Sequence, residues 1–391
     1  MKILIVHNRY TQAGGEDYVV DAELAMLRGN GVAAEVLFYQ NPSRMLSQIF
    51  GLILSPFNVR SYFQFKKILR EIRPTLVHIH NWHYTASPSL IWAAGSLGIP
   101  VVLTIHNYRL ICPSATLFHR GKLYLKSINS WGLLSAIKNR VYRDSFFATA
   151  FLALALKFNR KIGTWKKVDG FIFLNDFMRD IHHRALPDVA GVPNFIKPNF
   201  TVNIPLSSGC DISSRDGFLF VGRLSTEKGV EVLLQAFSES GLPLKIIGDG
   251  PMRGLVERYV SEFANIIYVG YQKKEYILHA MGVSRWLVFP SIWYEGMPIT
   301  ILEAFMAATP VIASRIGSLP SIVKEGENGI LFPPNEVNGL KDALKIAANM
   351  SLSDYSRYSV YCSDSFQKDF TEGENFKELS KIYEKIIDKS I

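Results

Sequence analysis

Short apolar runs alternate with amphipathic stretches along the first half of the chain. Continuous apolar runs of four to eight residues are typical of strands buried on both faces, and apolar residues three to four apart are typical of helices. Helices separate these runs, so the strands should be parallel and covered on both faces. The pattern predicts strands at 2–6, 35–38, 75–80, 100–105 and 170–174, and helices near 18–27, 63–72 and 87–94.

A stretch rich in Pro, Asn and Ser then interrupts the alternation, and we place a linker at 196–215. The alternation restarts after it, with strands at 217–221, 244–247, 266–269, 286–289 and 311–313, and helices at 230–238, 252–263, 274–281 and 299–307. The sequence therefore predicts an α/β fold of two Rossmann-like, doubly wound domains facing a central cleft. Their expected bounds are 1–195 and 216–372, followed by a terminal segment at 373–391.

Composition agrees with a globular protein that has sizeable cores. Of the 391 residues, 48% are hydrophobic and 20% are charged, which excludes disorder. Cys112, Cys210 and Cys362 are far apart and form no C-x-x-C pair, so disulfide scaffolds and zinc modules are excluded. The longest mostly apolar stretch, 146–158, is shorter than the roughly 20 residues of a membrane span. We expect a cytoplasmic protein.

The net charge of +9 comes almost entirely from one segment of the chain. Residues 120–167 contain eleven basic residues and one acidic residue, so the rest of the chain is almost neutral, which disfavours nucleic-acid binding. Apolar side chains alternate with these cations, as in helices that lie at a membrane surface. The segment predicts peripheral binding to an anionic membrane, on the inner face of the plasma membrane. The alternative is a solvated basic face over a core. The apolar members are Tyr124, Trp131, Leu133, Leu134, Tyr142, Phe146, Phe147, Phe151 and Leu152.

The strongest candidate for chemistry is the run Y-E-G-M-P-I-T-I-L-E-A at 294–304, directly after the predicted strand 286–289. Open α/β sheets bind ligands at this end of their strands. Gly296 permits close approach of the backbone, and the N–H groups at the start of the following helix favour a phosphate. Glu295 lies in the loop and Glu303 in the helix, so the two carboxylates should contact different ends of one ligand.

A second loop, at 222–229, places Arg223 and Lys228 between a strand and a helix. Two cations beside a helix N-terminus suit a diphosphate, although a solvated surface loop would look the same. A third loop, G-D-G-P at 248–251, does not continue as the G-x-G-x-x-G pattern of dinucleotide-binding folds. Dinucleotide oxidoreduction is therefore disfavoured.

In the first unit, Gly14 and Gly15 suit close approach to phosphates or an ordinary helix entry. Histidines lie at 78, 80, 83 and 106, and His80 and His106 end predicted strands. Without a carboxylate at H-E-x-x-H spacing we expect no metal site. His106 is the better candidate for contact with a substrate hydroxyl, with a structural histidine as the alternative. The chain has no G-x-S-x-G or Walker motif, which disfavours hydrolases and P-loop enzymes.

Four motifs of the second unit together resemble the family 4 retaining glycosyltransferases of the GT-B fold. They are G-R-x4-K-G at 222–229, G-D-G-P at 248–251, E-x7-E at 295–303, and G-S-L-P-S-I-V at 317–323 with E-N-G at 327–329. This likeness covers nearly all of the second unit. In the first unit, T-I-H-N-Y-R-L-I-C-P at 104–113 is similar to a bacterial subset that builds lipopolysaccharide, capsule or exopolysaccharide.

The resemblance implies roles for individual residues. Arg223 and Lys228 would hold the diphosphate of a nucleotide-sugar donor, Glu303 the ribose hydroxyls, and Glu295 hydroxyls of the donor sugar. His106 would contact the sugar, and a C-terminal helix at 376–387 would pack against the first domain. Backbone N–H groups of Gly296 and Met297 and the backbone near Tyr271 would also contact the donor. The remaining donor-binding positions are Gly14, Gly15, Gly222 and Gly248.

The implied reaction is a metal-independent, retaining transfer of a hexose to a glycan or lipid-linked acceptor, with His106, Glu295, Arg223 and Lys228 as its catalytic residues. No Asp-x-Asp lies near these loops, so Arg223 and Lys228 would replace a divalent ion, and no cofactor is expected beyond the nucleotide sugar. UDP, GDP and ADP remain open. The alternatives are a GT-B nucleotide-sugar epimerase, a phosphorylase carrying pyridoxal on a lysine, and a catalytically degenerate, membrane-associated binding module.

Overall fold

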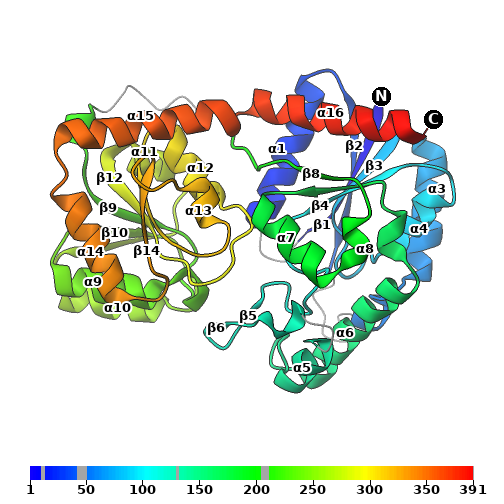
Figure 1. Ribbon diagram of the computed structural model, residues 1–391, viewed down its shortest axis with the longest axis horizontal. Helices are drawn as coiled ribbons and strands as arrows, with labels where there is room; N and C mark the ends of the chain where they lie inside the picture. Colours follow the sequence, from blue (N-terminus) through cyan, green and yellow to red (C-terminus); the bar gives the residue numbers. More distant parts are fainter. Residues whose placement is uncertain (10–13, 42–50, 129–131, 204–210, 391) are drawn as a thin grey trace. The chain divides into compact units, whose positions relative to one another are not determined.

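The chain forms two compact units, each built on one sheet. The computed structural model describes residues 1–9, 14–41, 51–128, 132–203 and 211–390. Unit 1 comprises Met1–His119, Tyr124–Asn199 and Glu372–Ile391, and unit 2 comprises Arg120–Leu123 and Phe200–Thr371 (Figure 1). The boundary after Asn199 falls inside the predicted linker, part of which lies outside the described residues.

Unit 1 contains a six-stranded parallel sheet in the order β2-β1-β3-β4-β7-β8. The apolar runs of the sequence form its central strands, which are buried along almost their whole length because helices cover both faces. Its strands are β1 (Lys2–Arg9), β2 (Ala33–Gln40), β3 (Leu76–Asn81), β4 (Val101–Ile105), β7 (Gly170–Phe173) and β8 (Asn194–Ile196). Its longer helices are α1 (Gly15–Gly29), α3 (Val59–Ile72), α4 (Ser89–Gly95), α5 (Gly132–Asn139), α6 (Phe146–Lys161), α7 (Asp176–Ala185) and α16 (Glu372–Ser390).

The prediction of a linker from residue 196 onward was wrong at its start. Residues 194–196 form the edge strand β8, which pairs with β7 from Phe171 to Phe173. Lys197, expected in the linker, is 1% exposed. A three-residue edge strand between prolines has no periodicity to reveal it, and its pairing with β7 is a long-range property.

Unit 2 contains a second six-stranded parallel sheet, in the order β11-β10-β9-β12-β13-β14. The chain runs outward from β9 to β11 and then returns to the other side of β9, so its direction reverses between β9 and β12. Its strands are β9 (Asp216–Val221), β10 (Leu244–Ile247), β11 (Ile266–Gly270), β12 (Ser284–Phe289), β13 (Val311–Ser314) and β14 (Gly329–Phe332). Its longer helices are α9 (Val230–Ser240), α10 (Arg253–Glu262), α11 (Lys274–Val283), α12 (Ile299–Met306), α14 (Val337–Ala348) and α15 (Leu352–Asp369).

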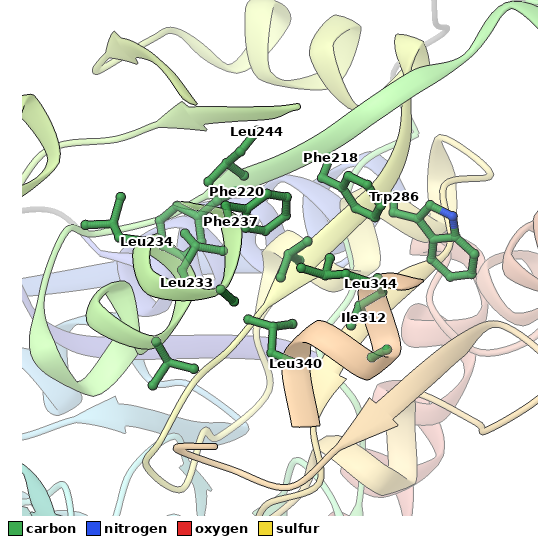
Figure 2. Packing of buried hydrophobic residues seen from close by; sticks show 14 of the residues in the cluster. Phe218, Phe220, Leu233, Leu234, Phe237, Leu244, Trp286, Ile312, Leu340 and Leu344 are labelled. Atoms are coloured by element: carbon green, nitrogen blue, oxygen red, sulfur yellow. The ribbon is translucent and has the colours of Figure 1, made fainter. Parts of the chain in front are cut away.

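The core of unit 2 lies between its sheet and helices α9 and α14 (Figure 2). Phe218 and Phe220 of β9 point to the same side of the sheet, as alternate residues of a strand must. They pack with Phe237 of α9 and with Leu340 and Leu344 of α14. Two parallel, doubly wound sheets are thus present, as predicted. Strand β14 and helices α14 and α15 were not among the predicted elements.

A buried polar cluster attaches α16 to the sheet of unit 1. The Lys197 ammonium lies 3.2 Å from Oε2 of Glu23, a residue of α1, and donates to Oδ1 of Asn375 in α16 at 3.0 Å. The hydroxyl of Tyr383, also in α16, lies 2.7 Å from Nδ1 of His78. Burial acts to raise the pKa of Glu23, but Lys197 and the neighbouring histidines hold it well below its usual value. Glu23 is therefore an ionised carboxylate inside the core.

No helix in the described part of the chain combines the length and the apolar character that crossing a bilayer requires.

Replacing Lys197 by Met should destabilise unit 1 strongly, because it leaves the carboxylate of Glu23 buried without its cation. We expect a loss of about 3–5 kcal/mol in the free energy of unfolding, measured by urea denaturation. Lys2→Met is the matched control, since the Lys2–Glu35 pair is partly exposed and should contribute less than about 1 kcal/mol. Adding Glu23→Gln to Lys197→Met should recover part of the loss. Equal losses in the two single variants would contradict this account.

Candidate active site

The reversal of strand order in unit 2 brings the two strongest sequence motifs to neighbouring strand ends. Strand β9 leads into the loop of Arg223 and Lys228, and β12, its hydrogen-bonded neighbour, leads into the loop of Glu295. A crevice opens at such a reversal because successive crossover helices lie on opposite faces of the sheet. The structure thus brings together two motifs that are more than 60 residues apart in the sequence.

Two glycines allow three loops at the strand ends of unit 2 to approach one another: Gly229 lies against the β12 loop, and Gly248 of the β10 loop lies against the β9 loop. At Gly229 φ is +71°, and a Cβ would lie 1.9 Å from the carbonyl oxygen of Pro290 in the β12 loop. At Gly248 φ is +147°, and a Cβ would lie 1.9 Å from the carbonyl oxygen of Gly222. Any side chain at either position would push neighbouring backbone aside. At Gly222 itself a Cβ would make only an ordinary contact, 3.5 Å from Phe220.

Lys228 and Glu295 form an ion pair at the centre of this site. Nζ of Lys228 lies 2.7 Å from Oε1 of Glu295, which is buried, and Ser291 donates its hydroxyl hydrogen to the same oxygen at 2.7 Å. The ammonium also lies about 5.5 Å from the ring centroids of Phe289 and Trp293. Both charges are therefore fixed in position before a ligand binds.

Arg223 differs from Lys228 in being exposed. Its side chain makes no hydrogen bond or ion pair with any residue that the structure describes. A guanidinium of this kind can turn toward an incoming anion and bind two of its oxygens at once. The first loop therefore offers one paired and one unpaired cation.

Glu303 lies in α12, is buried, and forms an ion pair with Lys274 at the start of α11. Burial raises the pKa of Glu303, and Lys274 acts in the opposite direction. The pair leaves the carboxylate able to accept hydrogen bonds from vicinal hydroxyls. Lys274 was predicted only as a helical residue, and nothing in its local sequence indicates the contact.

The loop of Gly296 and Met297 precedes α12. Helix α12 begins at Ile299, as predicted, with Pro298 as its N-cap. Ser318 anchors the loop by donating to the carbonyl oxygen of Glu295 at 2.9 Å.

Tyr271 follows β11 and is exposed, while the hydroxyl of Tyr268 donates to the carbonyl oxygen of Gly248 at 3.1 Å.

The candidates Gly14, Gly15 and His106 belong to unit 1. Gly14 is the N-cap of α1, and its N–H donates to Oδ2 of Asp17 at 2.9 Å. A Cβ at Gly14 or Gly15 would meet no atom of the described residues within 4 Å, so none of these residues crowds either glycine. This arrangement suits either of the two roles predicted for them.

His106 is the outer member of a chain of hydrogen bonds. Its Nε2 lies 2.9 Å from Nδ1 of His80, and Nε2 of His80 lies 3.0 Å from Oε1 of Glu23. Burial lowers the pKa of His80 to about 3 and that of His106 well below its usual value, so both rings are neutral. The ionised Glu23 can only accept, which makes His80 Nε2 a donor and His80 Nδ1 the acceptor of the His106 Nε2–H. Nδ1 of His106 is therefore an acceptor, suited to a substrate hydroxyl.

One cluster of metal-ligand type occurs in the described part of the chain, at Glu23, His78 and His80. The sequence expectation of no metal site considered only local spacing, and Glu23 is contributed by a different element, α1. The Lys197 ammonium already neutralises Glu23, and both ring nitrogens of His78 and of His80 have protein partners. These side chains therefore form a structural network rather than an open coordination site.

The comparisons with known proteins agree with this arrangement. A family model described as Glycosyltransferase Family 4 matches residues 20–200, and one described as Glycosyl transferases group 1 matches residues 213–359. Each model covers most of one of the two units.

Curated relatives include O-antigen chain mannosyltransferase C of Escherichia coli, 33% identical over 160 residues, which are 39% of this chain and 42% of the relative. D-rhamnosyltransferase WbpZ of Pseudomonas aeruginosa is 32% identical over 134 residues, 33% of this chain and 35% of the relative. The matched stretch thus spans less than half the length of these relatives.

Solved structures share the fold over the whole chain. Sucrose-phosphate synthase from Thermosynechococcus elongatus has a TM-score of 0.72 at 17% identity, with 100% of each chain covered. Anabaena HepE in complex with UDP-glucose has a TM-score of 0.66 at 13% identity, covering 98% of this chain and 100% of that one. Both are GT-B structures, so the expected GT-B fold is confirmed. With two family models, two parallel sheets and paired charges at the strand reversal, the chain belongs to the GT-B glycosyltransferases of family 4 and group 1.

Proposed function

We propose that this glycosyltransferase moves a hexose from a nucleotide-diphosphate sugar to a glycan or lipid-linked acceptor during synthesis of a bacterial surface polysaccharide, with retention of anomeric configuration. The observation that carries the proposal is the Lys228–Glu295 ion pair beside the unpaired Arg223, where the strand order reverses. It combines cations for a diphosphate with a buried carboxylate for sugar hydroxyls.

The donor is held mainly by unit 2. Arg223 and Lys228 bind the diphosphate; the Lys228 ammonium has three N–H groups, so it contacts Glu295 and a phosphate oxygen together. Glu303 accepts from the ribose hydroxyls, and Glu295 from hydroxyls of the donor sugar. N–H groups of Gly296 and Met297 contact the donor, and the backbone near Tyr271 faces the base.

The difficult step is departure of the nucleoside diphosphate, which gains a negative charge as the sugar–phosphate bond breaks. Fixed cations stabilise that charge without reorganising, an effect worth several kcal/mol in preorganised sites. The acceptor oxygen forms its bond to the anomeric carbon on the face that the phosphate leaves, and the departing phosphate oxygen takes the acceptor's proton. Glu295 is already bound by Lys228 and Ser291, which fits a binding role better than covalent attack.

The relatives favour polysaccharide chemistry. The names of two Escherichia coli relatives describe O-antigen chain mannosyltransferases, and that of a Corynebacterium glutamicum relative describes a GDP-mannose-dependent mannosyltransferase. HepE, in contrast, is described as a complex with UDP-glucose. Both UDP and GDP sugars are therefore donors to test.

Helix α6 supports peripheral binding to the inner face of the membrane. Phe147, Phe151, Leu154 and Phe158 recur at spacings of four, three and four, which places them on one face, and all are exposed. Phe147 is 74% exposed and Leu154 57%. Lys157, Arg160 and Lys161 end the same helix, as an interfacial helix on anionic lipid requires. Leu152, expected on this surface, is instead buried, and Trp131 lies outside the described residues.

Arg223→Ala should weaken binding of UDP or GDP without destabilising the fold, because Arg223 is exposed and its side chain has no partner among the described residues. The loss of one charge-assisted contact is worth about 1.5–3 kcal/mol, measured by calorimetry. Glu303→Gln should weaken binding comparably. Arg258→Ala, an exposed arginine on α10, is the control and should bind as the wild type. Unchanged affinity in both test variants would refute the donor site.

Activity should survive chelation, since Arg223 and Lys228 neutralise the diphosphate in place of a divalent ion. The measurement is release of nucleoside diphosphate from UDP-glucose or GDP-mannose, with and without EDTA. A loss on chelation that Mg²⁺ or Mn²⁺ restores would contradict metal independence.

Phe147→Ser with Leu154→Ser should reduce co-sedimentation with vesicles containing phosphatidylglycerol, because apolar insertion and basic attraction act together. Ile346→Ser with Val360→Ser is the matched control, since these unit 2 residues are 57% and 56% exposed. Binding by the wild type should fall with salt and be absent with neutral vesicles. Equal binding to neutral vesicles, or equal loss in the control, would exclude this surface.

A further inference from the structure

A row of polar side chains lines one face of the sheet in unit 1. His78 and His80 alternate along β3 and therefore point to the same side of it, and Thr104 and His106 alternate in the same way at the end of the neighbouring strand β4. The two strands pair these side chains: Nε2 of His78 lies 2.7 Å from Oγ1 of Thr104, and Nδ1 of His80 lies 2.9 Å from Nε2 of His106. The row thus leads from the interior to the carboxyl ends of the strands, where open α/β sheets bind ligands.

The inner end of this row is a buried carboxylate. Glu23 of α1 is 0% exposed, and its Oε1 lies 3.0 Å from Nε2 of His80 and 3.1 Å from Nδ1 of His78. Its Oε2 lies 3.2 Å from the ammonium of Lys197. Replacing a buried ion pair by apolar side chains is often neutral or stabilising, so stability alone does not explain why this pair lies beside two histidines.

The charge of Glu23 gives the row a direction. An ionised carboxylate only accepts, so Nε2 of His80 carries the hydrogen and the neutral ring accepts at Nδ1. His106 then donates from Nε2, which leaves its Nδ1 with a lone pair and without a hydrogen-bond partner among the described residues. Burial lowers the pKa of His106 well below its usual value, so the ring does not take up a second proton to meet an anion.

A lone pair held in this way distinguishes between groups on a sugar. It accepts a hydrogen bond from a hydroxyl, whereas a carboxylate, a keto oxygen or a fluorine atom presents only further lone pairs. A histidine that is free to exchange its tautomer would instead donate to such a group. The direction of the row therefore determines which ligands His106 can bind.

We propose that Glu23 is a positioning residue for sugar recognition: acting through His80, it keeps the acceptor nitrogen of His106 available to the ligand. The site then selects a donor sugar with a free hydroxyl at this point and excludes one that carries an acceptor-only group there. The inference rests on the proposed function and takes His106 as a contact of the donor sugar. Lys197 belongs to the same arrangement, because its charge keeps Glu23 ionised.

The first measurement is the position of the ring hydrogens in the ligand-free chain, by ¹⁵N NMR of the histidines. The wild type should carry hydrogen on Nε2 alone in both His80 and His106. The double variant Glu23→Gln with Lys197→Met removes both charges, and a glutamine side chain both donates and accepts, so each ring should become a mixture of tautomers. Tyr383→Phe is the matched control, since it removes the contact of α16 with His78 but leaves Glu23 and His80 in place.

The second measurement is donor affinity by calorimetry, with UDP-glucose or GDP-mannose and analogues in which fluorine replaces one sugar hydroxyl at a time. Replacing the hydroxyl that His106 accepts should cost the wild type and Tyr383→Phe at least about tenfold, and the double variant less than about threefold. Hydroxyls that donate to Glu295 should show equal losses in all three proteins, because Glu295 is independent of the row.

The outcomes separate this inference from the proposed function. Equal losses in the wild type and the double variant at every position, or hydrogen on Nδ1 of His106 in the wild type, would overturn the role of Glu23. A tautomer change in Tyr383→Phe as large as in the double variant would assign the effect to packing instead. If neither nucleotide sugar binds to the wild type, the proposed function fails, while the NMR spectra still decide whether Glu23 sets the tautomer. His80→Gln keeps the Glu23–Lys197 pair and replaces the double variant if that one does not fold.

Discussion

In a parallel sheet that is buried on both faces, the loops at the strand ends are the main place where polar groups can contact a ligand. All strands of such a sheet point the same way, so their carboxyl ends lie along one edge. In unit 2 the reversal between β9 and β12 concentrates Arg223, Lys228 and Glu295 there. In unit 1 the same constraint brings His80 and His106 together from adjacent strands.

This constraint explains why much of the fold and part of the site could be predicted. Strand periodicity identified most of both sheets, and Lys228 and Glu295 follow predicted strands within short motifs. Lys274, Glu23 and Lys197 could not be found, because each acquires its role from a partner on a distant element.

The buried network of unit 1 links its packing to its chemistry. Lys197 and the histidines keep Glu23 ionised, and an ionised Glu23 determines which nitrogen of His80 carries hydrogen. Through His80 it makes Nδ1 of His106 an acceptor. The position of α16, held by Asn375 and Tyr383, thus bears on His106, which we propose as a contact of the donor sugar. A structural lysine can in this way determine the hydrogen-bonding role of a site histidine.

The lysines of the unit 2 site each have a carboxylate partner, and this pairing has a chemical reason. In unit 2 Lys228 and Lys274 each have a carboxylate partner, and of the candidate cations Arg223 alone is exposed without one. In the proposed reaction the departing nucleoside diphosphate carries more charge than the donor, so a site of wholly unpaired cations would retain this product. Carboxylates beside the lysines moderate that attraction while keeping the ammonium groups in position.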